Sequence, residues 1–192
     1  RTARDDKNIK LSEVSVRLGE SFLGKNKLLQ AKQEFSKAIK LDPDNRRAHK
    51  MLGYVKLMEG LGSLYYIDRI QCLKGDEVGE HRQVAKKHFA AAEGHLKSSV
   101  KMAKKENKIE SESLLWLANI AVHFKRYEDA VSYAEQGLKH SFYPKRHLLH
   151  SVKGWAHFHK REYRKAGEDL RQAIFHENKF CLGRYRLAKV YF

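Results

Sequence analysis

The sequence predicts an all-α fold built from stacked helical hairpins. Helix-favouring Lys, Ala, Leu and Glu are frequent, whereas the 192 residues contain only two prolines. The pair Leu18-Gly19 recurs 34 residues later as Leu52-Gly53, a spacing typical of a repeated unit of two helices. One such hairpin cannot bury its own apolar face, so neighbouring hairpins are expected to stack on it.

Residues 12–45 form the first unit, and their pattern of small and apolar residues is that of a tetratricopeptide repeat (TPR). Gly19 and Ala31 are small enough to let two antiparallel helices approach closely, and Pro43 ends the second helix. The positions that match the pattern are Leu18, Gly19, Phe22, Ala31, Phe35, Ala38 and Pro43.

The same register continues along the chain. Gly154 precedes Ala166 by twelve residues, as Gly19 precedes Ala31. We therefore expect a TPR superhelical solenoid of about four and a half repeats. The expected units are 12–45, 46–110, 111–146, 147–180 and a first helix alone at 181–192.

The second unit is interrupted. Gly53 and the matching alanine of its second helix, Ala92, are 39 residues apart instead of 12, so about 27 residues are inserted near 60–85. Glycines at 60–62 and 75–79 predict breaks around a short extra helix over 64–73, with extended helices possible on either side. The insertion is either a second binding element or a longer hairpin that packs on its own repeat.

The N-terminal residues, the lengths of the apolar runs and the two cysteines give three further expectations. The polar residues 1–11 predict a flexible N-terminal tether. No apolar run approaches the length that spans a bilayer. Cys72 and Cys181 are too few for a disulfide framework and lack the spacing of a zinc or redox motif, so we expect buried thiols.

The formal net charge of +16 attracts polyanions such as nucleic acid, anionic lipid or an acidic protein. Lysines are spread along most helices, and the nearest approach to a basic run is 97–108. A solvated basic surface is therefore the simplest interpretation. Nucleic acid is the less favoured partner because no recognised base-reading motif accompanies the charge.

The concave groove formed by the first helices of the repeats is the expected partner site. Trp116, Trp155 and Phe158 are the strongest candidates, since large aromatics are the usual anchors of protein binding. About half of the groove candidates are expected to pack as ordinary solenoid core. The predicted groove residues are Val16, Leu23, Tyr54, Met58, Leu115, Trp116, Trp155, Phe158 and Tyr185.

The groove chemistry suits an amphipathic helix or an extended apolar peptide. A clamp for a C-terminal carboxylate is not expected, because Val16 and Glu20 occupy the places in the first unit where Lys and Asn would be required.

Catalysis, cofactors and metals are not predicted. The sequence lacks a Gly-rich phosphate loop, an HExxH motif and a G-x-S-x-G motif. His147, His150, His157 and His159 lie close in sequence, but no cysteine or carboxylate completes a familiar zinc spacing. Histidines 81, 88 and 95 recur every seven residues, as expected for a solvated helix face.

Two segments resemble the type IV pilus biogenesis lipoproteins of the PilF/PilW/Tgl type, the pilotins of outer-membrane secretins. Residues 16–55 are similar to that family's first repeat running into its second. Residues 140–174 contain the link Tyr143-Pro144-Lys145-Arg146 between the third and fourth units, where the family has a similar YP-plus-basic link. The insertion, the basic charge and the five first helices, where the family typically has six repeats, depart from its pattern.

The resemblance implies a non-enzymatic periplasmic protein held at the outer membrane by a lipidated cysteine upstream of Arg1, whose partner is the secretin. The positive charge would lie well beside anionic lipid. The alternative is a cytoplasmic TPR scaffold or regulator, and a third hypothesis is a helical repeat that binds RNA or DNA.

Overall fold

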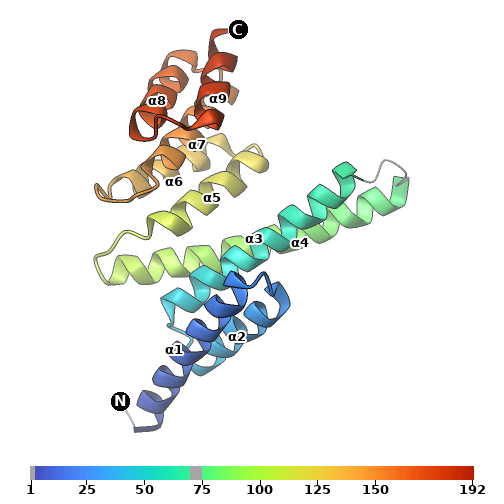
Figure 1. Ribbon diagram of the computed structural model, residues 1–192, viewed down its shortest axis with the longest axis vertical. Coiled ribbons are helices and arrows are strands. Elements are labelled where there is room, and N and C mark those ends of the chain that lie inside the picture. The colour runs from blue at the N-terminus through green and yellow to red at the C-terminus, as the bar shows by residue number, and fades with distance from the viewer. Residues whose placement is uncertain (1–2, 70–74) are drawn as a thin grey trace. The chain divides into compact units, whose positions relative to one another are not determined.

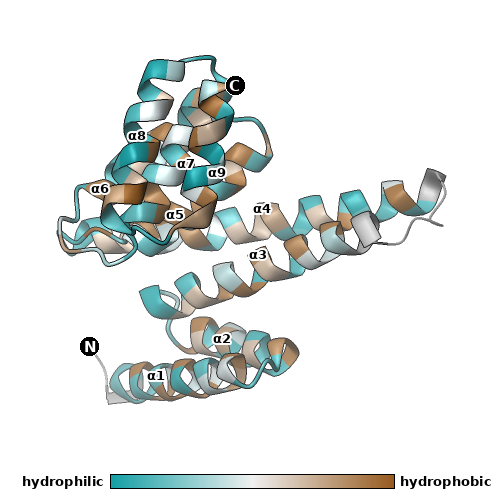
Figure 2. Ribbon diagram, turned by 45° about the horizontal axis from the view of Figure 1, so that its top comes forward, coloured by the Kyte–Doolittle hydropathy of each residue, from teal (hydrophilic) through white to brown (hydrophobic). Residues whose placement is uncertain are grey.

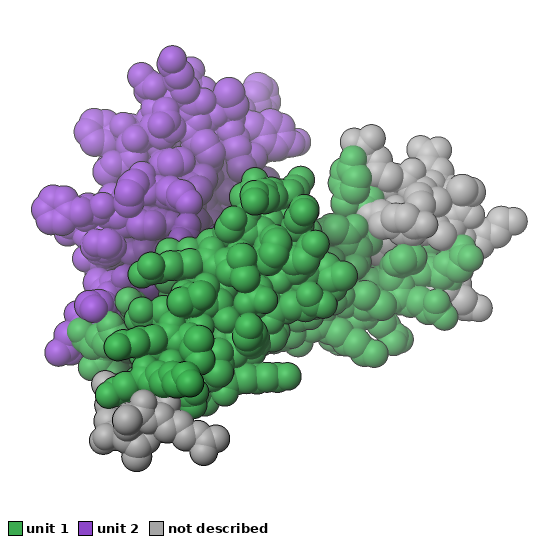
Figure 3. Space-filling model, turned by 60° about the horizontal axis from the view of Figure 1, so that its bottom comes forward, with its two compact units in different colours: residues 1–106 green, residues 107–192 purple. Residues whose placement is uncertain are grey.

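The computed structural model describes the backbone of residues 3–69 and 75–192, and every regular element in these ranges is an α-helix (Figure 1). The chain divides into two compact units, residues 1–106 and 107–192 (Figure 3). The all-α TPR prediction is confirmed. Unit 1 contains α1 (Ala3–Gly24), α2 (Leu28–Leu41), α3 (Arg46–Arg69) and α4 (Gly75–Lys105); unit 2 contains α5 (Ser111–His123), α6 (Tyr127–Leu138), α7 (Arg146–His159), α8 (Tyr163–His176) and α9 (Cys181–Tyr191).

Close approach of paired helices defines the hairpins. A Cβ added at Gly19 would lie 2.6 Å from the Phe35 ring, nearer than a real Cβ comes to any neighbour. The same contact recurs in two other hairpins, at 2.8 Å in each. The glycine register that predicted the repeats therefore marks the points where the helices touch. The pairs are Gly19 with Phe35, Gly53 with Leu96 and Gly154 with Leu170.

A common turn joins the helices of three hairpins. Its middle residue has a left-handed backbone, with φ of 59° at Asn26, 58° at Lys125 and 63° at Arg161. In the first turn the Asn26 amide donates to the Leu23 carbonyl and the next amide donates to Phe22. These bonds satisfy carbonyls that the end of a helix would otherwise leave free.

Buried polar side chains join the first repeat to the second. Ser12 Oγ donates to the Ala38 carbonyl at 2.8 Å, and Asn45 Nδ2 donates to Ser12 Oγ at 2.8 Å. Asn45 Oδ1 also accepts from the Ala48 amide, which lies in the first turn of α3. One buried apolar cluster of unit 1 consists of Val16, Ala31, Phe35, Ala38, Ala48, Leu52 and Val55.

The insertion lengthens both helices of the second hairpin, which corrects the predicted break at 60–62 and the separate helix over 64–73. α3 runs without interruption through Gly60 to Arg69, and residues 70–74 lie outside the described residues. Gly60 serves close packing, because a Cβ there would lie 3.2 Å from the Phe89 ring of α4. The outer ends of α3 and α4 extend past α1 and α2 (Figures 1 and 2).

Two further expectations are corrected. Helix α1 begins at Ala3, so residues 3–11 are helical and do not form the predicted flexible tether. Cys181 is exposed, unlike the buried thiol expected, and Cys72 lies outside the described residues. Among the described helices, none has the length and apolar character needed to cross a bilayer.

Candidate partner-binding site

Unit 1 places its four predicted groove residues in different environments. Val16 is 2% exposed and belongs to the core, which corrects the expectation that its side chain is free for a partner. Leu23 is partly buried against the same core. Tyr54 and Met58 are half-buried on α3. Leu23, Tyr54 and Met58 therefore each keep part of their surface open to solvent.

In unit 2, one of the predicted residues is buried and a second is half-buried. Leu115 is 4% exposed and lies in the core cluster of α5, α6 and α7, so it too is corrected to a core residue. Trp116 is partly buried against that cluster. Tyr185 of α9 is 58% exposed, and the Lys189 ammonium lies 5.7 Å from its ring centre.

Trp155 and Phe158, one turn apart on α7, form the strongest candidate for a partner contact. Their rings stack with centroids 4.8 Å apart and planes 8° from parallel. Both side chains are half-buried. The stack presents a wide, rigid apolar surface, which loses little side-chain entropy when a partner binds.

Arg186 of α9 fixes this stack from the neighbouring helix. Its guanidinium carbon lies 5.2 Å from the Trp155 ring centre, a favourable cation–π distance. Its Nη1 donates to Ser151 Oγ at 2.9 Å and to the Ser151 carbonyl at 3.1 Å. Burial lowers the pKa of Arg186 to about 10, so the side chain remains charged at neutral pH.

Three more rings extend the stack towards the turns between helices. His159 packs edge-on against Trp155 at 4.8 Å and lies parallel to Tyr127 of α6 at 5.0 Å. Tyr163 of α8 meets Phe158 edge-on at 5.9 Å and is half exposed. Burial, followed by the charges of Arg186 and Lys125, lowers the pKa of His159. We call Tyr127, Trp155, Phe158, His159, Tyr163 and Arg186 the aromatic cluster.

The aromatic cluster was only partly accessible to sequence reasoning. The register located Trp155 and Phe158 on a first helix, but it gave no sign that Arg186, 31 residues later, lies over the indole. Tyr127 and Tyr163 are each the first residue of the second helix of a hairpin, directly after the turn. This shared position in the repeat is the feature of the sequence from which their role could have been predicted.

Two histidines of α7 take part in an ion network with Glu162 and with Asp169 of α8. His150 Nδ1 lies 3.4 Å and His157 Nε2 3.7 Å from carboxylate oxygens of buried Asp169. His157 Nδ1 also lies 2.5 Å from Glu162, and this hydrogen bond is the main cause of the lowered pKa of Glu162. Among the described residues, no group of three or more His, Cys, Asp or Glu side chains is arranged to hold a metal ion.

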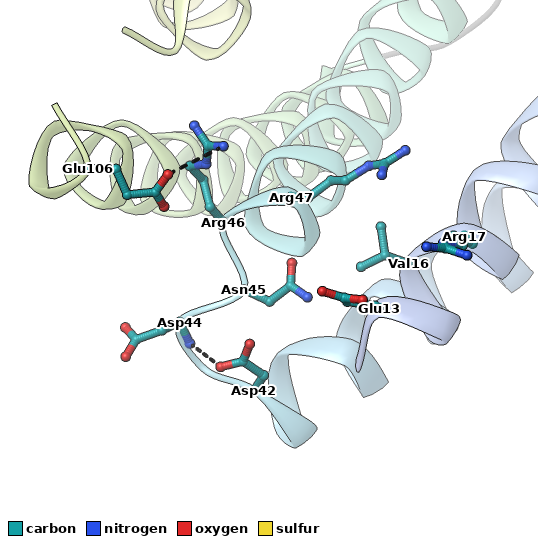
Figure 4. Close-up of a pocket in the computed structure, with 9 residues that line it drawn as sticks. All are labelled: Glu13, Val16, Arg17, Asp42, Asp44, Asn45, Arg46, Arg47 and Glu106. Carbon is teal, nitrogen blue, oxygen red and sulfur yellow. Dashed lines mark hydrogen bonds and ion pairs between the residues drawn. The ribbon is translucent and has the colours of Figure 1, made fainter. Parts of the chain in front are cut away.

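A second concave feature, in unit 1, is polar. It is an open cavity of about 340 Å³ between α1, the α2–α3 turn and the end of α4 (Figure 4). Arg46 faces Glu106 at 3.7 Å, and Arg47 holds Glu20 through two bonds of 2.7 and 2.6 Å. Acidic and basic side chains thus pair across this cavity, and its one apolar lining residue, Val16, is buried. Its lining is Glu13, Val16, Arg17, Asp42, Asp44, Asn45, Arg46, Arg47 and Glu106.

Family models agree with the repeats seen in both units. A model of the tetratricopeptide repeat matches residues 12–45, and another matches residues 117–179. Together they cover just over half of the chain. The chain belongs to the tetratricopeptide-repeat family. TPR domains are protein-binding modules, so the aromatic cluster of this TPR protein is a candidate contact for another protein.

Solved structures share this TPR fold. PilF of Pseudomonas aeruginosa aligns with a TM-score of 0.71 over 96% of this chain and 69% of its own, at 15% identity. PilW, a type IV pilus biogenesis factor, aligns with a TM-score of 0.61 over 93% of this chain and 68% of its own, at 14% identity. At these identities the likeness concerns the fold alone. A search of curated proteins gives no significant match.

Proposed function

We propose that this TPR protein is a non-enzymatic pilotin, which binds the secretin of a type IV pilus and assists its localisation and assembly in the outer membrane. The observation that carries the binding role is the aromatic cluster on unit 2. Trp155 and Phe158 are stacked, held from α9 by Arg186, and still partly open to solvent. A preformed apolar surface of this kind can capture an apolar segment of a partner with little reorganisation.

Two observations support the secretin as partner. The link Tyr143-Pro144-Lys145-Arg146 and the first repeat resemble the pilotin family. The fold agrees with those of PilF and PilW over more than nine-tenths of this chain. The proposal places the protein in the periplasm, attached to the outer membrane by a lipid on a cysteine that precedes Arg1.

Binding alone would be sufficient for this role. A module that prefers one conformation of the secretin lowers the free energy of that conformation, and the size of the shift is set by the difference in affinity between the two states. No cofactor or reacting group is required. The aromatic cluster would supply the affinity, while the lipid would fix the location.

The experiment is a pull-down of the secretin, co-expressed with the chain, using wild type and Trp155→Ala. Phe175→Ala is the matched control, because Phe175 is an aromatic of α8 that is 81% exposed and lies outside the cluster. We expect wild type and the control to retain the secretin, and the Trp155→Ala protein to lose it at least about tenfold, as for an anchor residue. Circular dichroism checks that both variants are folded.

Recovery of no secretin by the folded wild type contradicts the pilotin role. If cytoplasmic proteins are retained in its place, and Trp155→Ala releases them, the cytoplasmic scaffold becomes the better assignment. If nucleic acid is retained and released by salt, the chain is a polyanion-binding repeat.

A further inference from the structure

The solvent face of α4 carries an unbalanced line of positive charge. Between residues 82 and 105 this helix contains seven cationic side chains and a single carboxylate, Glu93. Glu93 lies 3.8 Å from Lys97, and its side chain is 17% exposed. We call the seven cations the basic face: Arg82, Lys86, Lys87, Lys97, Lys101, Lys104 and Lys105.

These cations point to solvent because the other side of α4 is apolar and buried. Ala85, Phe89, Ala92, Leu96 and Ala103 are at most 1% exposed and pack inside the hairpin. The helix is therefore amphipathic, with its lysines held away from the core. Figure 2 shows hydrophilic and hydrophobic residues alternating along α4.

Ion pairing within unit 1 does not neutralise the basic face. Of its lysines, Lys97 has a described carboxylate within ion-pair distance, and Lys86, Lys87, Lys101, Lys104 and Lys105 have none among the described residues. From residue 82 to residue 105 the helix rises by about 35 Å. Seven cations against one carboxylate over this length leave a net positive charge, which attracts an extended anionic surface.

Apolar side chains lie beside the outer part of this row. Leu61 and Tyr65 of α3 are 43% and 60% exposed. Because Gly60 packs on Phe89 and the helices are antiparallel, Leu61 and Tyr65 lie at the level of residues 84–88 along the hairpin. The outer hairpin thus combines lysines with exposed aliphatic and aromatic groups.

This combination is typical of elements that lie on anionic bilayers, where cations meet the headgroups and apolar side chains enter the interface. It is less suited to nucleic acid, because the basic face contains a single arginine, the residue type best suited to bidentate contacts with bases. We propose that the basic face of α4, with Leu61 and Tyr65 of α3, binds the surface of an anionic lipid bilayer. This binding is separate from the secretin site and does not require it.

The test is co-sedimentation of the chain with phosphatidylcholine vesicles, with and without about one-third phosphatidylglycerol. The chain is expected to bind only the anionic vesicles and to be released as salt screens the attraction. Replacing three lysines in Lys97→Gln/Lys101→Gln/Lys104→Gln should weaken binding at least about tenfold, since each juxtamembrane lysine contributes substantially. The three side chains are exposed, so the variant should fold normally.

The matched control removes the same charge elsewhere, as Lys25→Gln/Lys40→Gln/Lys139→Gln, at three exposed positions. It should retain binding within about threefold, because none of these three lysines belongs to the basic face. Equal losses in the two triple variants would overturn the assignment to α4. Tighter binding of duplex DNA than of the anionic vesicles, abolished by the α4 substitutions, would overturn the lipid assignment. Leu61→Ser/Tyr65→Ser should weaken vesicle binding several-fold, and unchanged binding would remove these residues from the contact.

Discussion

Gly53 shows how a single residue sets the distance between two helices. A Cβ at this position would lie 2.8 Å from two carbons of Leu96 and 3.3 Å from the Ala92 carbonyl oxygen. The neighbours would have to move by several tenths of an ångström. Such overpacking outweighs the helix propensity that alanine gains over glycine, about 1 kcal/mol.

We therefore predict that Gly53→Ala lowers the free energy of unfolding by about 1–3 kcal/mol, as measured by urea denaturation. Gly94→Ala is the matched control, because Gly94 lies in the same hairpin and a Cβ there meets nothing within 4 Å. The control should be stabilising by about 0.5–1 kcal/mol. Equal effects of the two substitutions would show that the close approach at Gly53 has no energetic weight.

The imidazoles of His49 and His95 face one another, with their Nδ1 atoms 3.1 Å apart. His49 Nε2 lies 3.1 Å from the Pro43 carbonyl, which can only accept, so His49 is protonated at Nε2. Its neutral Nδ1 can then accept from His95. Burial, followed by the charges of His49 and Lys56, lowers the pKa of His95.

This arrangement predicts loss of stability in mild acid. With a folded pKa below the ordinary value of about 6.5, His95 takes up its proton more readily in the unfolded chain. The free energy of unfolding should therefore fall as the pH drops from 7.5 to 5.5. The lowered pKa values of His123, His147, His159 and His176 act in the same direction.

Urea denaturation across this range measures the effect, and His95→Gln should reduce the slope because glutamine does not titrate. His140→Gln, at an exposed position, is the control and should leave the slope nearly unchanged. A slope that is the same in wild type and His95→Gln would exclude His95 as a contributor.

At the scale of elements, the second hairpin is a TPR hairpin with two lengthened helices. Register aligns Met58 with Gly24 and Phe89 with Leu28, the residues that flank the three-residue turn of the first hairpin. Replacing residues 59–88 with Lys-Asn-Lys should thus restore a standard repeat. The Gly53–Leu96 contact lies outside the replaced segment and should remain.

We predict that this shortened chain unfolds cooperatively by circular dichroism, with a smaller urea m-value because less surface is buried. Its secretin binding should persist if the aromatic cluster of unit 2 is the anchor, whereas its vesicle binding should fall. A broad, non-cooperative transition would show that the lengthened part is needed for the fold of unit 1.

Sequence reasoning succeeded where the repeat pattern had a direct steric cause. Gly19, Gly53 and Gly154 are spaced as they are because each admits a large side chain from the partner helix. Glycine gave a wrong prediction at Gly60, where the sequence predicted a break in the helix. There glycine also admits a ring, that of Phe89, so the helix continues.

The start of α1 was missed for a different reason. Its first turns are polar, and polarity was interpreted as lack of structure. The helix nevertheless extends from Ala3 into the packed residues Ser12 and Val16. Of the candidate groove, Trp155 and Phe158 could be located from the register, whereas burial of Val16 and Leu115 depends on neighbouring helices that the pattern does not resolve.

At the scale of the whole molecule, the two proposed binding surfaces belong to different units. The aromatic cluster lies in unit 2, and the basic face lies in unit 1. In a repeat protein each unit is stabilised mainly by its nearest neighbours, so changes to one surface should leave the other folded. Secretin binding and vesicle binding are therefore expected to be separable by the substitutions described.

The most direct test of the central claim uses the fluorescence of Trp155. The chain has two tryptophans, so Trp116→Phe leaves Trp155 as the sole indole. Titration of this variant with the purified secretin should shift the Trp155 emission saturably, because the partner covers the aromatic cluster. A secretin that binds with wild-type affinity and leaves the emission unchanged would contradict the account.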